Sequence, residues 1–127
     1  MAINPVGAEV YFTKAMENYQ KALTIDAKSF DAMYSIGALW YNKAAAYSVE
    51  LNVLSSDYTP AGTKKYDAKK IQMDEAFSKA LPFFVQAEQI HPDDLNTLVA
   101  LKEIYARQEK FDKVEEYKQK LAKLGNQ

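Results

Sequence analysis

Apolar residues recur at steps of three and four along almost the whole chain, and polar residues fill the positions between them. This period is that of an amphipathic α-helix, and no stretch alternates long enough to predict a β-strand. Glycine and proline, which interrupt helices, gather at only a few places. The pattern therefore predicts an all-α chain of about five helices, at about residues 7–24, 30–55, 65–90, 95–108 and 111–124.

Cap residues set several of the expected helix ends. Short polar side chains accept hydrogen bonds from the first backbone N–H groups of a helix. Ser29 is therefore expected to cap the second helix, and either Asp93 or Asp94 the fourth. Gly125 is expected to close the last helix, because glycine is the commonest residue just past a helix end.

The third expected helix contains a proline. Pro82 removes one backbone hydrogen bond, which predicts a kink in a continuous helix; the alternative is a new helix that begins near Pro82. A polar loop at about residues 56–64 precedes this helix and holds the turn sequence Thr59–Gly62. The basic residues that follow this turn predict either a solvated helix face or a docking point for an acidic partner: Lys64, Lys65, Lys69 and Lys70.

Two helical stretches repeat one pattern. Each has a small residue, an aromatic residue four positions later and a small residue three further on, namely Ala15, Tyr19 and Ala22, then Ala80, Phe84 and Ala87. A turn follows each stretch, and then a helix with matching spacing, Met33-x-x-Ile36-Gly37-x-x-Trp40 or Leu98-x-x-Leu101-Lys102-x-x-Tyr105. Because one helix pair cannot bury its own apolar face, such pairs must stack on their neighbours.

These positions resemble the tetratricopeptide repeat (TPR), a helix pair of 34 residues with small, aromatic and proline positions. The resemblance is fullest in the middle of the chain, and the last repeat departs from it at Lys102, where glycine belongs. It implies one TPR-like domain, residues 1–127, folded as a right-handed α-α superhelix. Its expected parts are a half repeat at 7–28, a long repeat at 29–92 and a final repeat at 93–125.

The long repeat departs from the family in its length. Trp40 and Ala80 stand about 40 residues apart where the repeat has about nine, which leaves roughly 31 extra residues. We expect a helical insertion at about residues 43–73 that lengthens both helices of the pair. At about 1.5 Å per residue, the elongated antiparallel pair would project by roughly 20 Å. The insertion resembles those of some bacterial TPR proteins.

Composition narrows the possible partners. The chain has 16 basic and 17 acidic residues, which gives no electrostatic reason to expect nucleic acid. No window approaches eighteen apolar residues, so no membrane insertion is expected. The chain has no cysteine and its start shows no signal peptide. A soluble protein is expected, periplasmic if a signal was trimmed and otherwise cytoplasmic.

Residues that carry chemistry do not form a catalytic pattern. Glu88 and His91 have the spacing of one di-iron ligand pair, but such a site needs two pairs and the chain has one histidine. Adjacent carboxylates such as Asp93 and Asp94 do not face each other on a helix. We therefore expect no enzyme activity, no cofactor and no metal. The alternative is a pocket between the long hairpin and the stack, which would need converging polar groups.

The resemblance also implies where a partner binds. In TPR proteins the first helix of each pair lines a concave surface. Some members grip a peptide carboxylate there with lysine and asparagine, but Tyr34 and Glu103 stand at two of those places here. Tyrosines at such positions either contact a peptide or are covered by a neighbouring helix. The candidate contact residues are Asp31, Tyr34, Tyr41, Asn42, Asn96, Glu103 and Arg107.

The expected function is a non-catalytic interaction scaffold that binds a peptide or protein partner through this concave face. The alternative is structural self-association as a homodimer. The first repeat lacks its first helix, and end repeats usually need a polar cap. Val10, Tyr11 and Phe12 would then be partly exposed on an uncapped face that a second copy covers.

Overall fold

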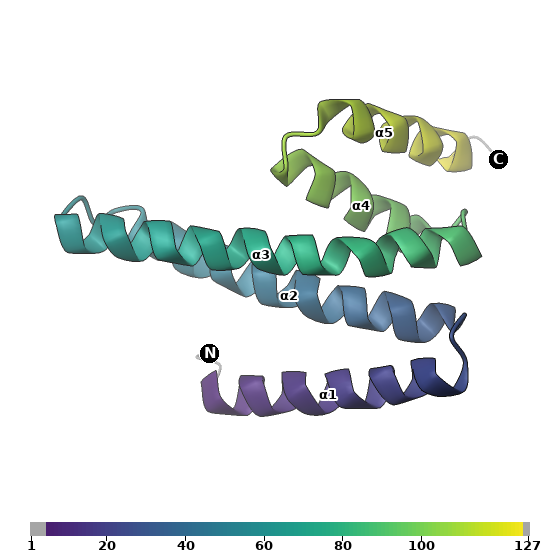
Figure 1. The fold of residues 1–127 in the computed structure, drawn as a ribbon. Helices are drawn as coiled ribbons and strands as arrows, with labels where there is room; N and C mark the ends of the chain where they lie inside the picture. Colours follow the sequence, from purple (N-terminus) through teal and green to yellow (C-terminus); the bar gives the residue numbers. More distant parts are fainter. Residues whose placement is uncertain (1–4, 126–127) are drawn as a thin grey trace.

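The computed structural model describes residues 5–125, which form five helices joined by short connections (Figure 1). Their bounds are α1 Pro5–Ile25, α2 Phe30–Leu54, α3 Pro60–Ile90, α4 Leu95–Arg107 and α5 Phe111–Gly125. No strand occurs in this part of the chain. Each helix packs on the one before it, so that α1, the α2–α3 pair, α4 and α5 follow one another through the molecule. The predicted all-α fold class is confirmed.

The third helix begins earlier than the sequence pattern suggested. α3 starts at Pro60, so the predicted loop at 56–64 is wrong in its second half. Thr59 is the cap, since its hydroxyl oxygen accepts a 3.0 Å hydrogen bond from the Gly62 N–H. Proline is suited to the first helical position, because an N–H group there would have no partner within the helix and its absence loses no hydrogen bond. α3 also continues through Pro82, so the alternative of a new helix there is wrong.

Two of the expected caps are present and one is not. The Ser29 hydroxyl oxygen accepts from the Ala32 N–H at 3.2 Å. Asp94, rather than Asp93, caps α4, and its carboxylate accepts from the N–H and the hydroxyl of Thr97 at 2.9 and 2.7 Å. Gly125 is the last described residue and is itself helical, without the positive φ of a glycine C-cap.

The core lies where α3 is covered by α2 on one side and by α4 on the other. Its largest fully buried side chains include Phe77 and Phe84 of α3 and Leu101 and Ile104 of α4. Small residues let the helices approach closely, as expected from the repeated pattern. A Cβ at Gly37 of α2 would lie only 3.0 Å from the Phe84 ring, so this glycine sets the spacing between α2 and α3.

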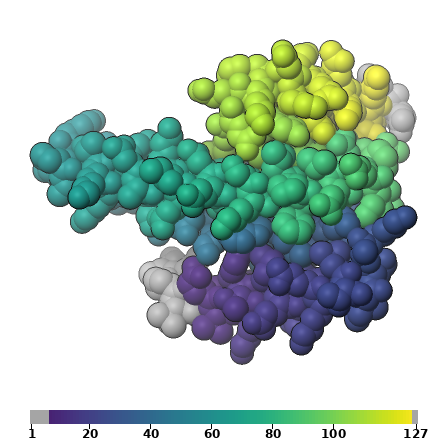
Figure 2. Space-filling model, viewed as in Figure 1, coloured from purple at the N-terminus to yellow at the C-terminus, as the bar shows by residue number. Residues whose placement is uncertain are grey.

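The elongated helix pair is present. α2 and α3 have 25 and 31 residues, against 13 and 15 for α4 and α5. Their connected ends project to one side of the stack as an antiparallel hairpin (Figures 1 and 2). Leu51 and Met73 are buried between the two helices, whereas Val49, Val53 and Ile71 on the outer faces are exposed.

The first helix covers one face of α2. The Phe12 ring packs edge-on against Trp40 with 4.9 Å between ring centroids. Lys43 lies over the Phe12 ring at 4.3 Å and forms a 3.4 Å ion pair with Glu9. No helix among residues 5–125 is long and apolar enough to cross a membrane.

Candidate interaction surface on α2 and α4

Two helices that are not consecutive share one surface. α2 and α4 run in the same direction, because each is connected by a short turn to the antiparallel α3 between them. The Tyr41 hydroxyl of α2 donates a 2.6 Å hydrogen bond to the Glu103 carboxylate of α4. Near the start of the two helices, the negative charge of Asp94, the residue that caps α4, contributes to raising the pKa of Tyr34 on α2. The surface therefore combines side chains that are about 60 residues apart in the chain.

A buried aromatic ring forms the floor of this surface. Phe77 of α3 is buried, and the Tyr41 ring meets it edge to face with 5.4 Å between centroids. The Arg107 guanidinium of α4 lies over the same ring, 4.6 Å from its centroid. Such stacking is favourable because the ring face carries negative charge density. Tyr41, Glu103 and Arg107 are thus held in place around Phe77 while their polar groups face outwards or one another.

The environment raises the pKa of two tyrosines on this surface. Burial, the hydrogen bond to Glu103 and the charge of Glu103 raise the pKa of Tyr41 to about 12, and Arg107 acts in the opposite direction. The pKa of Tyr34 is also raised, by burial and then by the charge of Asp94. A tyrosine with the ordinary pKa of 10.0 is already protonated at neutral pH, and the raised pKa keeps the Tyr41 phenol a hydrogen-bond donor to Glu103 further into the alkaline range.

The structure brings only some of the sequence candidates together. Tyr34 packs on Phe84 with 5.6 Å between centroids, and it joins Tyr41, Glu103 and Arg107 on the α2–α4 surface. Three other candidates are exposed, and their side chains make no hydrogen bond or ion pair with any other residue among 5–125: Asp31, Asn42 and Asn96. No polar contact among residues 5–125 fixes these three side chains.

Sequence reasoning missed the contribution of α3. The family pattern assigns binding positions to the first helix of each pair, and α3 is a second helix. Phe77 has the spacing of an ordinary core residue, and its buried ring gives no separate signal. Only the tertiary arrangement shows that Tyr41 and Arg107 both pack on the ring of this core residue.

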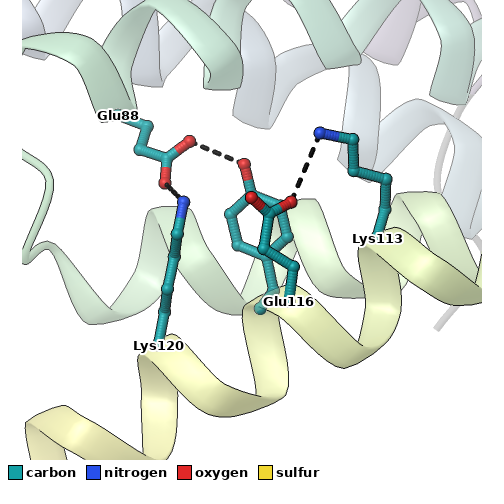
Figure 3. A network of polar contacts seen from close by, with 5 residues as sticks. Glu88, Lys113, Glu116 and Lys120 are labelled. Atoms are coloured by element: carbon teal, nitrogen blue, oxygen red, sulfur yellow. Dashed lines mark hydrogen bonds and ion pairs between the residues drawn. The ribbon is translucent and has the colours of Figure 1, made fainter.

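The Glu88 and His91 pair does not assemble a site. The Glu88 carboxylate accepts hydrogen bonds from the Tyr117 hydroxyl at 2.6 Å and from Lys120 Nζ at 2.8 Å (Figure 3). The His91 ring packs edge-on against Phe30 with 4.6 Å between centroids. Among residues 5–125 no group of three or more potential ligands could hold a metal ion.

Comparison of the chain with models of protein families finds no match, and comparison with curated proteins finds none either. An assignment to a class of proteins therefore depends on the residues and on the geometry described above.

Proposed function

We propose that this chain is a non-catalytic interaction module of the TPR type, which binds a peptide or protein partner on the α2–α4 surface. The observation that carries the proposal is the Tyr41–Glu103 hydrogen bond over the Phe77 ring, with Arg107 stacked beside it. Tyrosine and arginine are the side chains that most often dominate binding energy at protein interfaces. Here their positions are fixed before a partner arrives, which reduces the entropy lost on binding.

The fold supports the same proposal. Pairs of antiparallel helices stack in chain order, and the first helices of two successive pairs, α2 and α4, run parallel. The small and aromatic positions of the repeated pattern lie at the contacts, as Gly37 against Phe84 illustrates. We take this arrangement as a short right-handed stack, with the long hairpin as its individual feature.

The test is a selection from a library of random dodecapeptides displayed on phage, with the purified protein as target. Peptides that bind are expected to lose at least tenfold in affinity when Tyr41→Ala or Glu103→Ala is introduced. Tyr58→Ala is the matched control, because Tyr58 is also a tyrosine but is 89% exposed at the hairpin tip. Peptides that bind all four proteins equally, or a selection that yields none, would contradict the proposal.

A second candidate function is self-association through α1. Val10 and Tyr11 are 49% and 67% exposed, which leaves an apolar patch on the outer side of the first helix. If a second copy covers this patch, light-scattering mass rises with concentration over a hundredfold range, and Tyr11→Lys abolishes the rise. A constant mass near 14.4 kDa removes this candidate.

A further inference from the structure

A polar notch lies where the long hairpin leaves the stack. Here α3 passes beside the connection between α4 and α5. The outline of the molecule steps inwards between the projecting hairpin and the α4–α5 layer (Figures 1 and 2). The notch has a volume of about 340 Å³ and is open to solvent on one side. Its lining residues are Asp74, Phe77, Ser78, Arg107, Gln108 and Lys110.

Two cations on one wall of the notch have no anionic partner. The central carbon of the Arg107 guanidinium lies 4.6 Å from the Phe77 ring centroid, and Lys110 Nζ lies 5.9 Å from the Tyr105 ring centroid. Neither side chain forms an ion pair with any carboxylate among residues 5–125. A guanidinium over an aromatic ring keeps its N–H groups available, and their planar fork matches the two oxygens of a carboxylate.

The same notch contains an acceptor without a donor. Gln108 Oε1 is buried and has no hydrogen-bond partner among the described residues. The other end of this amide, Nε2, reaches Ser78 Oγ only at 3.5 Å. Exchanging the two ends would leave a buried N–H group unpaired instead. Neither end of this amide therefore has a strong hydrogen bond among the described residues, so a ligand in the notch has no such bond to displace.

From these three features we infer that the notch binds the carboxylate of an aspartate or glutamate side chain in a partner peptide. The carboxylate accepts from Arg107 and Lys110, and the Gln108 amide turns from its buried position to hydrogen-bond the backbone of the same peptide. Arg107 borders both the notch and the Tyr41–Glu103 pair. A peptide that lies on the α2–α4 surface therefore has residues in the middle of its sequence beside the notch. An internal side chain, rather than a chain end, is therefore the assigned occupant.

This inference rests on the proposed function and names the chemistry of the partner. Asp74 lines the same notch, so its charge opposes the bound carboxylate, which Arg107 and Lys110 must outweigh, and it disfavours a second acidic residue beside the first.

The first experiment tests the notch without any selected peptide. N-acetyl-glutamate methylamide is titrated into ¹⁵N-labelled protein, and the glutamine analogue serves as the uncharged control. We expect saturable shifts of the Gln108 side-chain amide and the Arg107 Nε–H signal with the glutamate compound only. Equal shifts with both compounds, or shifts confined to other residues, overturn the inference whether or not peptides bind elsewhere.

The second experiment uses peptides from the phage selection, synthesised with amidated ends to remove the terminal carboxylate. Replacing the critical acidic residue by its amide is expected to weaken binding at least tenfold in the native protein. The same replacement should have no effect in Arg107→Gln/Lys110→Gln, and its full effect in Lys123→Gln, an exposed lysine on α5. Binding that depends on a free C-terminus, or equal losses in all three proteins, contradicts the inference and leaves the proposed function standing.

Discussion

The Tyr117 hydroxyl donates a 2.6 Å hydrogen bond to the Glu88 carboxylate and thereby ties α5 to α3. Lys120 donates to the second oxygen of the same carboxylate at 2.8 Å, so both oxygens of Glu88 have partners (Figure 3). Tyr117 is the one buried residue of α5 within the described chain. The attachment of the last helix therefore depends on this contact to an unusual degree, since little other apolar surface of α5 is fully covered.

We expect Tyr117→Phe to lower the free energy of unfolding by about 1–3 kcal/mol, because a half-buried carboxylate loses a hydrogen bond while the ring packing is kept. Urea denaturation followed by circular dichroism measures this change. Lys113→Ala is the control, because the Lys113–Glu116 ion pair at 3.3 Å is on the surface, where solvent screens the attraction and such pairs contribute little. A Tyr117→Phe protein as stable as the native one would contradict the argument.

Stability is expected to fall at alkaline pH. The pKa of Tyr41 is raised from 10.0 to about 12, and burial and Glu88 raise the pKa of Tyr117 as well. Folding therefore favours the protonated phenols. Their contribution is complete below pH 10 and is lost as pH rises through the folded-state pKa. The free energy of unfolding should decrease from pH 10 to pH 12.

Tyrosine variants separate this effect from the titration of lysines. The decrease between pH 10 and 12 should be smaller in Tyr41→Phe than in the native protein, since phenylalanine has no proton to lose. Tyr58→Phe should keep the native slope, because this side chain lies exposed at the hairpin tip. Urea titrations at a series of pH values give the slopes, and three equal slopes would show that Tyr41 is not responsible.

Some of this structure could be predicted from the apolar pattern alone, and some could not. The spacing of small and aromatic residues predicted the helices and the long hairpin, because a helix repeats its apolar positions every three or four residues along the sequence. Tyr41 and Glu103 were named by the resemblance to TPR binding positions, not by the spacing, and a hydrogen bond joins them. The contribution of Phe77 to the α2–α4 surface and the notch beside Gln108 depend on which helices become neighbours. The periodicity of a single helix does not determine its neighbours.

Gly37 illustrates a position where the pattern and the structure agree. We expect Gly37→Ala to destabilise the fold by about 1–2 kcal/mol, although alanine is the better helix former. The added Cβ would lie 3.0 Å from a ring carbon of Phe84, whose buried side chain cannot easily move. Gly125→Ala is the control, because nothing lies within 4 Å of the added Cβ there. Thermal unfolding of both variants checks the difference, and a stabilised Gly37→Ala would mean that the ring adapts.

The turn at the hairpin tip is held by a small chain of hydrogen bonds. The Asp57 carboxylate accepts from the Thr59 N–H at 3.0 Å and from the Thr59 hydroxyl at 2.6 Å, and the Thr59 oxygen in turn caps Gly62. The hydrogen bond from the Thr59 hydroxyl is the largest cause that lowers the pKa of Asp57, and the bond from the Thr59 N–H is the next. The positive charge of Lys65 adds to the effect. A Cβ at Gly62 would overlap the Asp57 carboxyl group, so a larger residue there would push this carboxyl group out of its hydrogen bonds.

We expect Gly62→Ala to break the cap and to open the first turn of α3 without unfolding the stack, because the tip projects away from it. Amide hydrogen exchange should quicken at about residues 57–66 and stay unchanged in α4. Lowering the pH should have the same local effect. The pKa of Asp57 is lower in the folded state, so its contribution is present above the ordinary value of 3.8 and is lost as pH falls through the folded value. Equal exchange rates at about residues 57–66 in Gly62→Ala and in the native protein would show that the hairpin tip does not depend on the cap.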